Sequence, residues 1–488
     1  MKKKKMLRRL MLYLLIAPLS LMACSENTEI PNVKPENPDK PVIVDNVSGE
    51  YYDWTKTGQP ERPYIHDYSQ LMMMKMTVAW KDGKGGTTVK LTYDECLDYI
   101  KMIDQMSRGV KKIVYIVGGT FLGHDDGYPA FDKFNEAMKR PQDATAKDSY
   151  FWLVKEAAKY NTLVSMHLNI NDAYTTSPYW HTYYKNDLLC KNADGSYVIK
   201  GGERMIYRVN LKKEWEMGLL QKRIDGVIEM LDLKNIGTLH LDVFHPDESP
   251  YHGTTMEDQN IVMRKVLRYF RDKGVDITRE DYKNIDHTRT DYFIGLTPAV
   301  WWNNLNEDEL VKIRPELSVG GRSGQFGTYY EDLGFLFGEN MMAENILLHK
   351  GGFDELSRDF CKYSLQFFYL NKHKLESYDK TNKVAKYSGN VVVSWKDRTV
   401  TEGGRILRKN NDMLFPIHWT KDKELIAYSE KGYGSMTWEL SDDWKNLTSV
   451  AVYPITANGI GSKKTVAVNN GKIILTMKAG EMLSIRMN

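Results

Sequence analysis

Two acidic residues stand where apolar segments of the sequence end, a position in which a carboxylate is costly unless it is paired or used. Asp242 closes the run TLHL in the stretch GTLHLDVFHPDESPYHG, and Glu280 follows the short run GVDIT. Both runs have the composition of buried β-strands, and they are consecutive strands along the chain. Because neighbouring strands of a sheet lie about 5 Å apart, the two carboxyl groups could approach one another closely.

A carboxyl pair of this kind could hydrolyse a glycosidic bond. Retaining glycosidases place two carboxyl groups roughly 5–5.5 Å apart. One of them attacks the anomeric carbon, and the other protonates the leaving oxygen, with a pKa raised by burial and by the neighbouring charge. Taken singly, Asp242 could pair with a Lys or Arg inside the fold, and Glu280 could lie in a solvated loop or at a helix start. The prediction therefore depends on the two acids occurring together.

Polar and aromatic residues at the ends of other apolar runs could complete a sugar site. Aromatic rings offer stacking surfaces, and hydrogen-bonding groups recognise the sugar hydroxyls. We predict substrate contacts from His167, Asn169, Asp172, Tyr174, His245, Trp301 and Trp302, with Asn171, Tyr179 and Trp180 as further candidates. Asp172 could instead cap a following helix, and the two consecutive tryptophans could be core residues.

The histidines around Asp242 form no recognisable metal motif. His245 and His252 flank Asp247, but this spacing matches no standard ligand pattern. His240 alternates with the apolar residues of its run, which is typical of a hydrogen-bonded residue inside a barrel. We therefore predict no bound metal and no cofactor.

From about residue 70 to residue 380, apolar β-like runs alternate with helical patterns. Strands are expected at 71–80, 111–120, 162–172, 237–244, 274–281 and 292–302. Helices are expected after the capping box of Thr92 and Glu95, after Asp148 as N-cap, over about 211–233, and after Thr255 and Asp258. Apolar strands that alternate with helices indicate a parallel sheet. We predict a (β/α)8 TIM-type barrel, with its active site at the carboxyl ends of the strands; a doubly wound sheet is the alternative.

After about residue 395 the sequence changes to short alternating segments separated by Gly, Asn-Gly and Asp. The segment VNNGKI contains an Asn-Gly pair, which is a hairpin signal. This pattern predicts a C-terminal antiparallel β-sandwich domain. The expected organisation is a signal peptide at 1–24, a tether at 25–50, the catalytic barrel at 51–390 and the sandwich at 391–488.

The first residues have the features of an export signal. The basic stretch MKKKKMLRRL precedes an apolar run that is too short to span a membrane, and LMAC ends at Cys24. The last four residues resemble the lipobox of bacterial lipoproteins. We expect lipidation of Cys24 and a Pro-rich tether at 25–50, which would hold the protein on the outer membrane of a Gram-negative bacterium. Ordinary secretion is the alternative.

Composition excludes other classes of function. A formal net charge of +3 over 488 residues gives no nucleic-acid footprint. Cys96, Cys190 and Cys361 are widely spaced, which predicts buried thiols and neither disulfides nor a zinc site. We expect a glycan as the partner and a monomeric chain.

Three segments, in this order, resemble glycoside hydrolase family 101, the endo-α-N-acetylgalactosaminidases, and the related family 129: LVSMHLNINDAYTTSPYW, LHLDVF and GVDITRED. The later segment MLFPIHWTKDKELIAYSEKG resembles the β domain that follows the barrel of that family. The resemblance implies a (β/α)8 barrel followed by β-sandwich structure. It also matches the sugar-binding strand end of the family to His167, Asn169, Asp172 and Tyr174.

The same resemblance implies the roles of the two acids. Asp242 matches the nucleophile and Glu280 the acid/base, with the adjacent Asp281 as the alternative acid/base. The implied activity is that of a retaining α-glycosidase, and the α-linked N-acetylgalactosamine of mucin-type O-glycans is the leading substrate. The alternatives are a non-catalytic surface glycan-binding lipoprotein and an α-galactosidase-like barrel hydrolase.

Overall fold

The structure is a computed structural model that describes residues 64–202, 205–280, 296–299, 328–340 and 352–488. All of these residues belong to one compact unit of the chain. The expected signal peptide, the lipidation site at Cys24 and the tether lie outside the described residues. Within the described part of the chain, no helix is long and apolar enough to cross a membrane.

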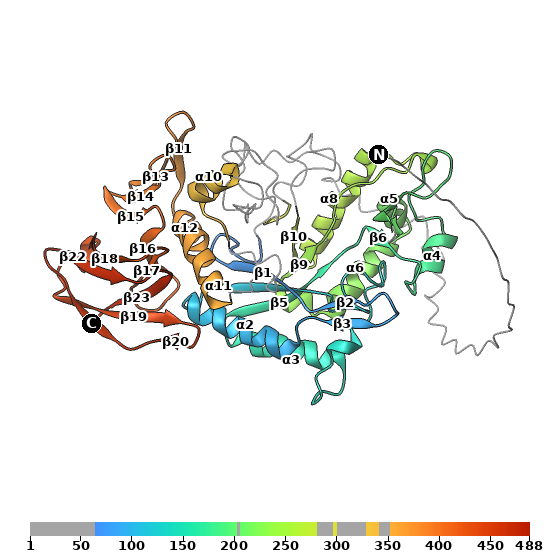
Figure 1. Cartoon of the computed structure of the whole chain (residues 1–488). Coiled ribbons are helices and arrows are strands. Elements are labelled where there is room, and N and C mark those ends of the chain that lie inside the picture. The colour runs from blue at the N-terminus through green and yellow to red at the C-terminus, as the bar shows by residue number, and fades with distance from the viewer. Residues whose placement is uncertain (1–63, 203–204, 281–295, 300–327, 341–351) are drawn as a thin grey trace, which may run out of the picture. The chain divides into compact units, whose positions relative to one another are not determined.

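A parallel sheet of five strands forms the first part of the fold (Figure 1). In sheet order the strands are β1 (Met72–Thr77), β4 (Lys112–Val117), β5 (Thr162–Leu168), β9 (Thr238–Leu241) and β10 (Asp276–Arg279). Each neighbouring pair is parallel, and the order in the sheet is the order in the sequence. A doubly wound sheet reverses its strand order at a switch point, so this order favours the predicted barrel.

Both edges of this sheet are hydrogen-bonded to residues that come later in the chain, as the strands of a barrel are. Beside β10, the N–H of Arg279 donates to the carbonyl of Ala299 (3.2 Å). The described residues of the strand predicted at 292–302 therefore lie where the next barrel strand belongs. Beside β1, the N–H of Met73 donates to Oδ1 of Asn340 (3.2 Å).

Side chains of the strands alternate between the inside of the barrel and the surrounding helices. Met73, Ile113, Tyr115 and Ala299 pack together in one small apolar cluster. Their neighbours on the opposite face of the strands, such as Met74, belong to the large core under the helices. Side chains along a strand alternate between the two faces with a period of two. Polar side chains farther along these strands therefore also lie on the inner face, at the carboxyl end of the sheet. These side chains are Lys75, His167 and His240, followed by Asp242 and Glu280 just after their strands.

Three helices begin with a capping box: α2 (Tyr93–Met106), α3 (Ala146–Ala158) and α8 (Met256–Asp272). The predicted starts of α2 and α8 are confirmed. The predicted N-cap of α3 is wrong, because Thr145 is the N-cap and Asp148 is its partner three residues later. The side chain of Asp148 accepts a hydrogen bond from the N–H of Thr145 (2.9 Å).

The single helix expected over 211–233 is interrupted twice. It consists of α5 (Leu211–Glu216), α6 (Leu219–Met230) and α7 (Leu233–Ile236). Gly218 has φ of 71° and Asp232 has φ of 54°. Left-handed conformations of this kind cannot continue a right-handed helix.

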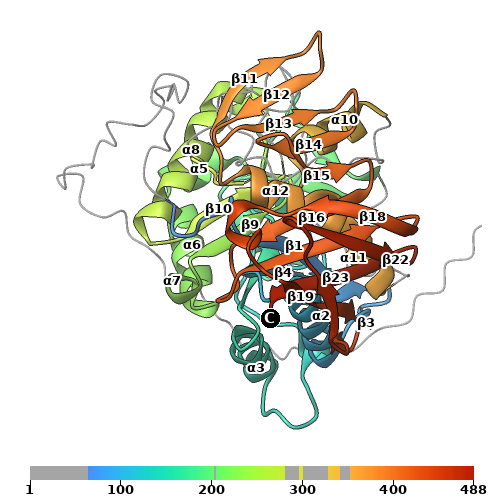
Figure 2. The ribbon, with the colours of Figure 1, turned by 90° about the vertical axis from the view of Figure 1, so that its left-hand side faces the viewer.

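Antiparallel sheets form the C-terminal part of the chain (Figure 2). Most strands belong to one 11-stranded sheet, and β18 pairs with β22 in a second, two-stranded sheet. The strands are β11 (Leu375–Asp379), β12 (Val384–Tyr387), β13 (Val391–Ser394), β14 (Thr399–Glu402), β15 (Arg405–Lys409), β16 (Asp412–Ile417), β17 (Glu424–Ser429), β18 (Tyr433–Glu439), β19 (Ser449–Thr456), β20 (Gly459–Ile460), β21 (Lys464–Ala467), β22 (Lys472–Met477) and β23 (Glu481–Met487).

The predicted β-sandwich is confirmed, and its large sheet begins at β11. One apolar cluster joins residues of the two sheets, among them Leu414 and Trp438. The turn at the Asn-Gly signal is confirmed, since Asn470 and Gly471 have φ of 49° and 71° and an isolated bridge joins Asn469 to Lys472. The flanking strands form no hairpin with each other, because β21 pairs with β19 and β22 pairs with β18.

The remaining described elements lie in the segments between these strands. They are β2 (Ala79–Lys81), β3 (Thr87–Val89), β6 (Asp172–Ala173), β7 (Ile199–Lys200), β8 (Ile206–Arg208), α4 (Trp180–Lys185), α10 (Thr328–Phe337), α11 (Phe353–Asp359) and α12 (Leu365–Leu370), with short helical turns η1 (Glu136–Met138), η3 (Pro250–His252), η6 (Phe360–Ser364) and η7 (Asp442–Trp444). Cys96, Cys190 and Cys361 are buried free thiols, as predicted.

Candidate active site

Asp242 follows directly on β9, at the carboxyl end of the parallel sheet. Its backbone N–H donates to the carbonyl of Leu168 at the end of β5 (2.9 Å). The next residue, Val243, has φ of 46°, a left-handed conformation that is rare for a β-branched side chain. The chain therefore turns away from its strand immediately after the carboxylate, whose residue is only 7% exposed.

Glu280 lies beside Asp242. The pairing of β10 with β9 sets Arg279 opposite Leu241, so the same register brings the next two residues side by side. Their carboxyl groups share a hydrogen bond. The strained turn contributes as well, because the N–H of Val243 donates to Oε2 of Glu280 (3.3 Å). A hydrogen bond between two carboxyl groups requires that one of them carries a proton.

Lys75 determines which carboxyl group holds this proton. Its ammonium lies 3.3 Å from Oε1 of Glu280, and both side chains are buried. Burial opposes ionisation of Glu280, but Lys75, the hydrogen bond from Asp242 and the N–H of Val243 outweigh it and hold the pKa of Glu280 below its ordinary value. Burial, followed by the charge of Glu280, raises the pKa of Asp242 well above its ordinary value. The proton of the free site therefore lies on Asp242.

This charge state corrects the expectation of a raised pKa for Glu280. Lys75 stands on β1 and Glu280 follows β10, so the contact between them depends on how the sheet curves into a barrel. A lysine inside the apolar run LMMMKMTVAW was the available signal, because a cation among buried residues needs a partner.

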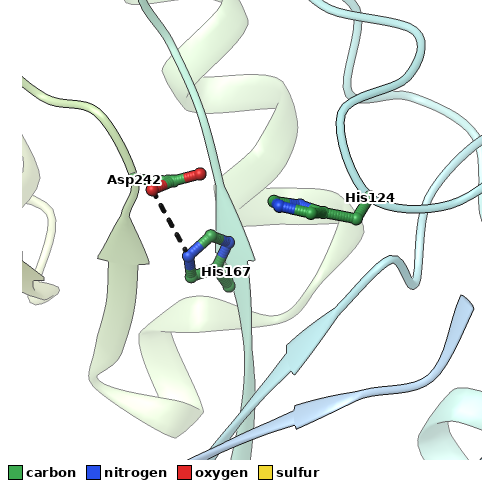
Figure 3. A group of neighbouring side chains, drawn as sticks. All are labelled: His124, His167 and Asp242. Atoms are coloured by element: carbon green, nitrogen blue, oxygen red, sulfur yellow. Dashed lines mark ion pairs between the residues drawn. The ribbon is translucent and has the colours of Figure 1, made fainter. Parts of the chain in front are cut away.

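Imidazole rings gather at the same end of the sheet (Figure 3). Nε2 of His167 lies 3.7 Å from Oδ1 of Asp242. The ring of His167 stacks on the ring of His240, with 4.9 Å between their centroids. Nδ1 of His240 is hydrogen-bonded to Oγ1 of Thr278 (2.9 Å), which confirms the barrel residue predicted there. His124 approaches from the loop after β4, and its ring meets His167 edge-on.

Both buried imidazoles are neutral near neutral pH. Burial, followed by the charge of Lys75, lowers the pKa of His167 and of His240 well below the ordinary value. Nδ1 of His167 is buried without a hydrogen-bond partner among the described residues. The ring therefore offers a polar atom to a ligand.

Other residues that were predicted to bind the sugar lie on the loop after β5 and form hydrogen bonds or ion pairs with protein side chains. Nδ2 of Asn169 donates to Oδ2 of Asp172 (2.8 Å). Asp172 and Asp247 both form ion pairs with the buried Arg208. Asp172 begins the short strand β6 and does not cap a helix. This network ties the loop after β5 to the loop after β9.

The remaining predicted residues differ in their surroundings. Burial, followed by the charge of Arg208, lowers the pKa of His245 to about 4. The ring of Tyr174 is buried, and the ammonium of Lys81 lies 4.7 Å from its centroid. The carbonyl of His245 accepts a hydrogen bond from Nδ2 of Asn171 (2.7 Å).

The last of the predicted candidates contact other protein side chains or cannot be placed. The hydroxyl of Tyr179 donates to Asp132 (2.5 Å), and Trp180 packs edge-on against Tyr207. The predictions for Asp281, Trp301 and Trp302 fall outside the described residues.

The loop after β4 supplies two residues that the sequence analysis missed, His124 and Asp125. Oδ1 of Asp125 lies 3.5 Å from Nδ1 of His124. The charge of Asp125 also contributes to the raised pKa of Asp242. The motif GHDD stands close behind the end of a predicted strand. The position of this motif soon after a predicted strand was therefore the signal that could have identified both residues.

Comparisons with known proteins agree with this arrangement. The sequence model of the family described as Endo-alpha-N-acetylgalactosaminidase, glycoside hydrolase family 101, matches residues 84–295. The beta sandwich domain of family 101 matches residues 361–460. The first match contains Asp242 and Glu280, and the second covers much of the antiparallel sheet. Family 129 stays a prediction.

Among solved structures, the fold is similar to an alpha-N-acetylgalactosaminidase, NagBb from Bifidobacterium bifidum. Its complex with GalNAc has a TM-score of 0.52 at 9% identity, over 70% of this chain and 58% of that chain. The ligand-free form has a TM-score of 0.50 at 11% identity, over 68% of this chain and 57% of that chain. This chain thus spans less than two thirds of that protein, and the likeness is one of fold. The two family matches, to the catalytic domain and to the beta sandwich domain, show that the chain belongs to glycoside hydrolase family 101.

Proposed function

We propose that this protein is a retaining α-glycosidase with Asp242 and Glu280 as its reacting carboxyl pair. The observation that carries the proposal is that these two buried carboxyl groups lie side by side at the carboxyl ends of two neighbouring parallel strands. A purely structural carboxylate pairs with a cation, whereas Asp242 faces a second acid. Such an arrangement costs stability and is typical of catalytic sites. Membership of family 101 supports the proposal.

In the proposed mechanism Asp242 is the nucleophile and Glu280 the acid/base. The proton that Asp242 carries in the free site first passes along the shared hydrogen bond to Glu280. The Asp242 carboxylate then attacks the anomeric carbon, while Glu280 gives its proton to the leaving oxygen as the glycosidic bond breaks. Glu280 next takes a proton from water, which cleaves the glycosyl ester and restores the Asp242 carboxylate. The reversed assignment needs no initial transfer and is the second candidate.

Azide rescue distinguishes the two assignments. With an aryl α-glycoside, Asp242→Asn and Glu280→Gln should each lose most of their turnover. Azide should then give the β-glycosyl azide with the nucleophile variant and the α-glycosyl azide with the acid/base variant. An α-azide from Asp242→Asn would establish the reversed roles, and near-wild-type turnover of either variant would refute the pair. Glu248→Gln, at an exposed position of the loop after β9, is the matched control and should retain activity.

We propose α-linked N-acetylgalactosamine as the sugar, which the description of the family supports. Aryl α-glycosides of N-acetylgalactosamine, galactose and glucose should be hydrolysed with the first preferred. A preference for galactose would favour the α-galactosidase-like alternative, and binding without turnover would favour a glycan-binding protein. Release of a disaccharide from a glycosylated Ser or Thr would indicate endo action.

We also propose that Cys24 carries a lipid that anchors the protein to the outer membrane. The basic stretch, the apolar run and the LMAC segment support this proposal. Cys24→Ser should move the protein from the membrane fraction to the soluble fraction. Membrane association that is unchanged in this variant would argue against the anchor.

A further inference from the structure

We propose that His124, His167 and Asp242 form a site for a late transition-metal ion such as Zn²⁺, and that the ion competes there with the sugar. Each of these residues offers one ligand atom, and the three atoms all lie within 4.8 Å of one another (Figure 3). The metal site follows from these side chains alone. The competition rests on the proposed function, because Asp242 is the proposed nucleophile.

The spacing of the ligands fits a small tetrahedral ion. Zinc binds imidazole nitrogen at about 2.0–2.1 Å, so tetrahedral ligand atoms lie about 3.3–3.5 Å apart. Nε2 of His167 and Oδ1 of Asp242 are already 3.7 Å apart. His124 lies on a loop and its side chain is 17% exposed, so a small movement of this ring completes the set. Three protein ligands leave one position of the ion for water.

The ligand types determine which ions the site prefers. Two imidazoles with one carboxylate suit zinc, copper and nickel. Calcium and magnesium prefer sites built from oxygen ligands. The site should therefore distinguish Zn²⁺ from Ca²⁺ and Mg²⁺ at equal concentration.

Two independent features of the histidines point to a ligand. The buried ring of His167 also belongs to a second potential ligand group, with His240 and Glu280. The carboxylate of Asp125 lies 3.5 Å from Nδ1 of His124. Metal-bound histidines commonly have their second ring nitrogen bonded to a carboxylate, which orients the ring. The group of His124, His167 and Asp242 includes the partly exposed ring of His124, and it is therefore the group that an ion reaches from solution.

Charges of both signs surround the site. Asp242, Asp125 and Glu280 contribute carboxyl groups, and Lys75 contributes one ammonium. An ion that binds Asp242 takes the place of the proton on this carboxyl group. An ion on Asp242 also prevents this carboxylate from attacking the anomeric carbon.

Cobalt absorption and zinc calorimetry on the full-length protein in detergent test the site directly. Wild type should show the visible absorption bands of bound Co²⁺, which Zn²⁺ abolishes and Ca²⁺ or Mg²⁺ does not. His124→Gln should bind one ion fewer per chain. His181→Gln, on an exposed residue of α4, is the matched control and should bind as wild type does. Equal binding by wild type and His124→Gln, or no binding at all, would overturn the site.

Two further measurements separate a lost ligand from a misfolded variant and from a failed function. Zn²⁺ should raise the melting temperature of wild type and of His181→Gln but not that of His124→Gln, and an equal rise in all three contradicts the site. Zn²⁺ should raise KM for the aryl α-glycoside without lowering kcat, and chelation should reverse this effect. Inhibition that lowers kcat alone refutes the competition. If no glycoside is hydrolysed, the proposed function fails while the Co²⁺ bands still decide the metal site.

Discussion

The ammonium of Lys75 faces Glu280, and its charge is the largest of the contributions that lower the pKa of Glu280. In Lys75→Met the pKa of Glu280 should rise, since burial is then opposed by fewer favourable contacts. We expect kcat/KM to fall by about 10²-fold. The acidic limb of its pH profile should move upward by about one unit.

Lys75→Arg is the matched control, because it keeps the positive charge and should restore the acidic limb. A pH profile of Lys75→Met that keeps the wild-type acidic limb would contradict the role of Lys75. A fall in activity without that movement would indicate that Lys75 only fills space.

The raised pKa of Asp242 implies that this carboxyl group lowers the stability of the folded protein at neutral pH. Its pKa in the folded protein is raised well above the unfolded value, so the stability associated with its proton is present at low pH and is lost as the pH rises through the folded pKa. In Asp242→Asn the amide can donate to Glu280 at every pH. The free energy of unfolding should therefore rise at neutral pH, by about 1–3 kcal/mol.

Urea unfolding at two pH values tests this prediction. The gain of Asp242→Asn should shrink below about pH 4, where Asp242 is protonated in both states. Glu280→Gln is the control, and its free energy of unfolding should change in the opposite direction. The pKa of Glu280 is lowered, so its contribution is present above the unfolded pKa and is lost as the pH falls through the folded one. A lower free energy of unfolding for Asp242→Asn than for wild type at neutral pH would contradict the assignment of the proton to Asp242.

The sequence was informative about single residues where a local pattern carried the information. Asp242 and Glu280 could be predicted because each one ends an apolar run. Lys75 and His124 could not be assigned, because their contacts join strands and loops that are far apart in the sequence. The contact of Lys75 with Glu280 lowers the pKa of Glu280. Because this contact was missed, the raised pKa was predicted for Glu280, whereas it belongs to Asp242.

At the scale of elements, local signals predicted starts better than interruptions. A Thr and an acid three residues later marked the starts of α2 and α8, because the capping hydrogen bonds lie within a few residues. The breaks at Gly218 and Asp232 were missed. Helical spacing of apolar residues continues across such short breaks, so the periodicity alone cannot reveal them.

A Ser–His–Asp chain joins the loop after Asp242 to Asp187, which follows α4, and this chain is part of the fold. Oγ of Ser249 is hydrogen-bonded to Nδ1 of His252 (2.7 Å), and Nε2 of His252 to Oδ2 of Asp187 (2.7 Å). Ser249 is fully buried, and its Oγ accepts a hydrogen bond from the N–H of Lys191 (2.8 Å). A hydroxyl so placed cannot reach a substrate. The chain thus fixes the loop that borders the carboxyl pair.

We therefore expect Ser249→Ala to keep its chemistry and lose stability. The free energy of unfolding should fall by about 1–2 kcal/mol, because buried partners lose a hydrogen bond. Turnover of the folded variant should stay within a few-fold of wild type, since a large loss of transition-state binding requires contact with the reacting groups. Denaturant unfolding and kcat, compared with Asp242→Asn, measure both effects. Lost turnover with unchanged stability would identify Ser249 as a catalytic residue instead.

At the scale of the whole described unit, the barrel and the sandwich share one core. The large apolar cluster contains Met72 and Ile100 from the barrel part and Val391 and Phe415 from the antiparallel sheet. A hydrogen bond from Nε1 of Trp419 to the carbonyl of Ser107 also joins the two parts (2.8 Å). A continuous core predicts that both parts unfold together in one transition.

Arg108 and Glu424 form the ion pair that tests this coupling. Nε and Nη2 of Arg108 donate to the two carboxylate oxygens of Glu424 (2.6 and 3.3 Å), and Glu424 is only 3% exposed. Arg108→Met leaves this buried carboxylate with weaker compensation from Arg486, at 3.7 Å. The free energy of unfolding should fall by about 1–3 kcal/mol, and the whole transition should move without splitting.

The exposed pair of Lys101 and Asp98 on α2 provides the matched control. Lys101→Met should change the free energy of unfolding by less than about 0.5 kcal/mol, because solvent screens an exposed pair. Denaturant unfolding followed by tryptophan fluorescence and by circular dichroism compares the two variants. A second transition in Arg108→Met would mean that the sandwich unfolds independently of the barrel. An equal loss of unfolding free energy in both variants would mean that the buried pair of Arg108 and Glu424 stabilises the protein no more than an exposed pair does.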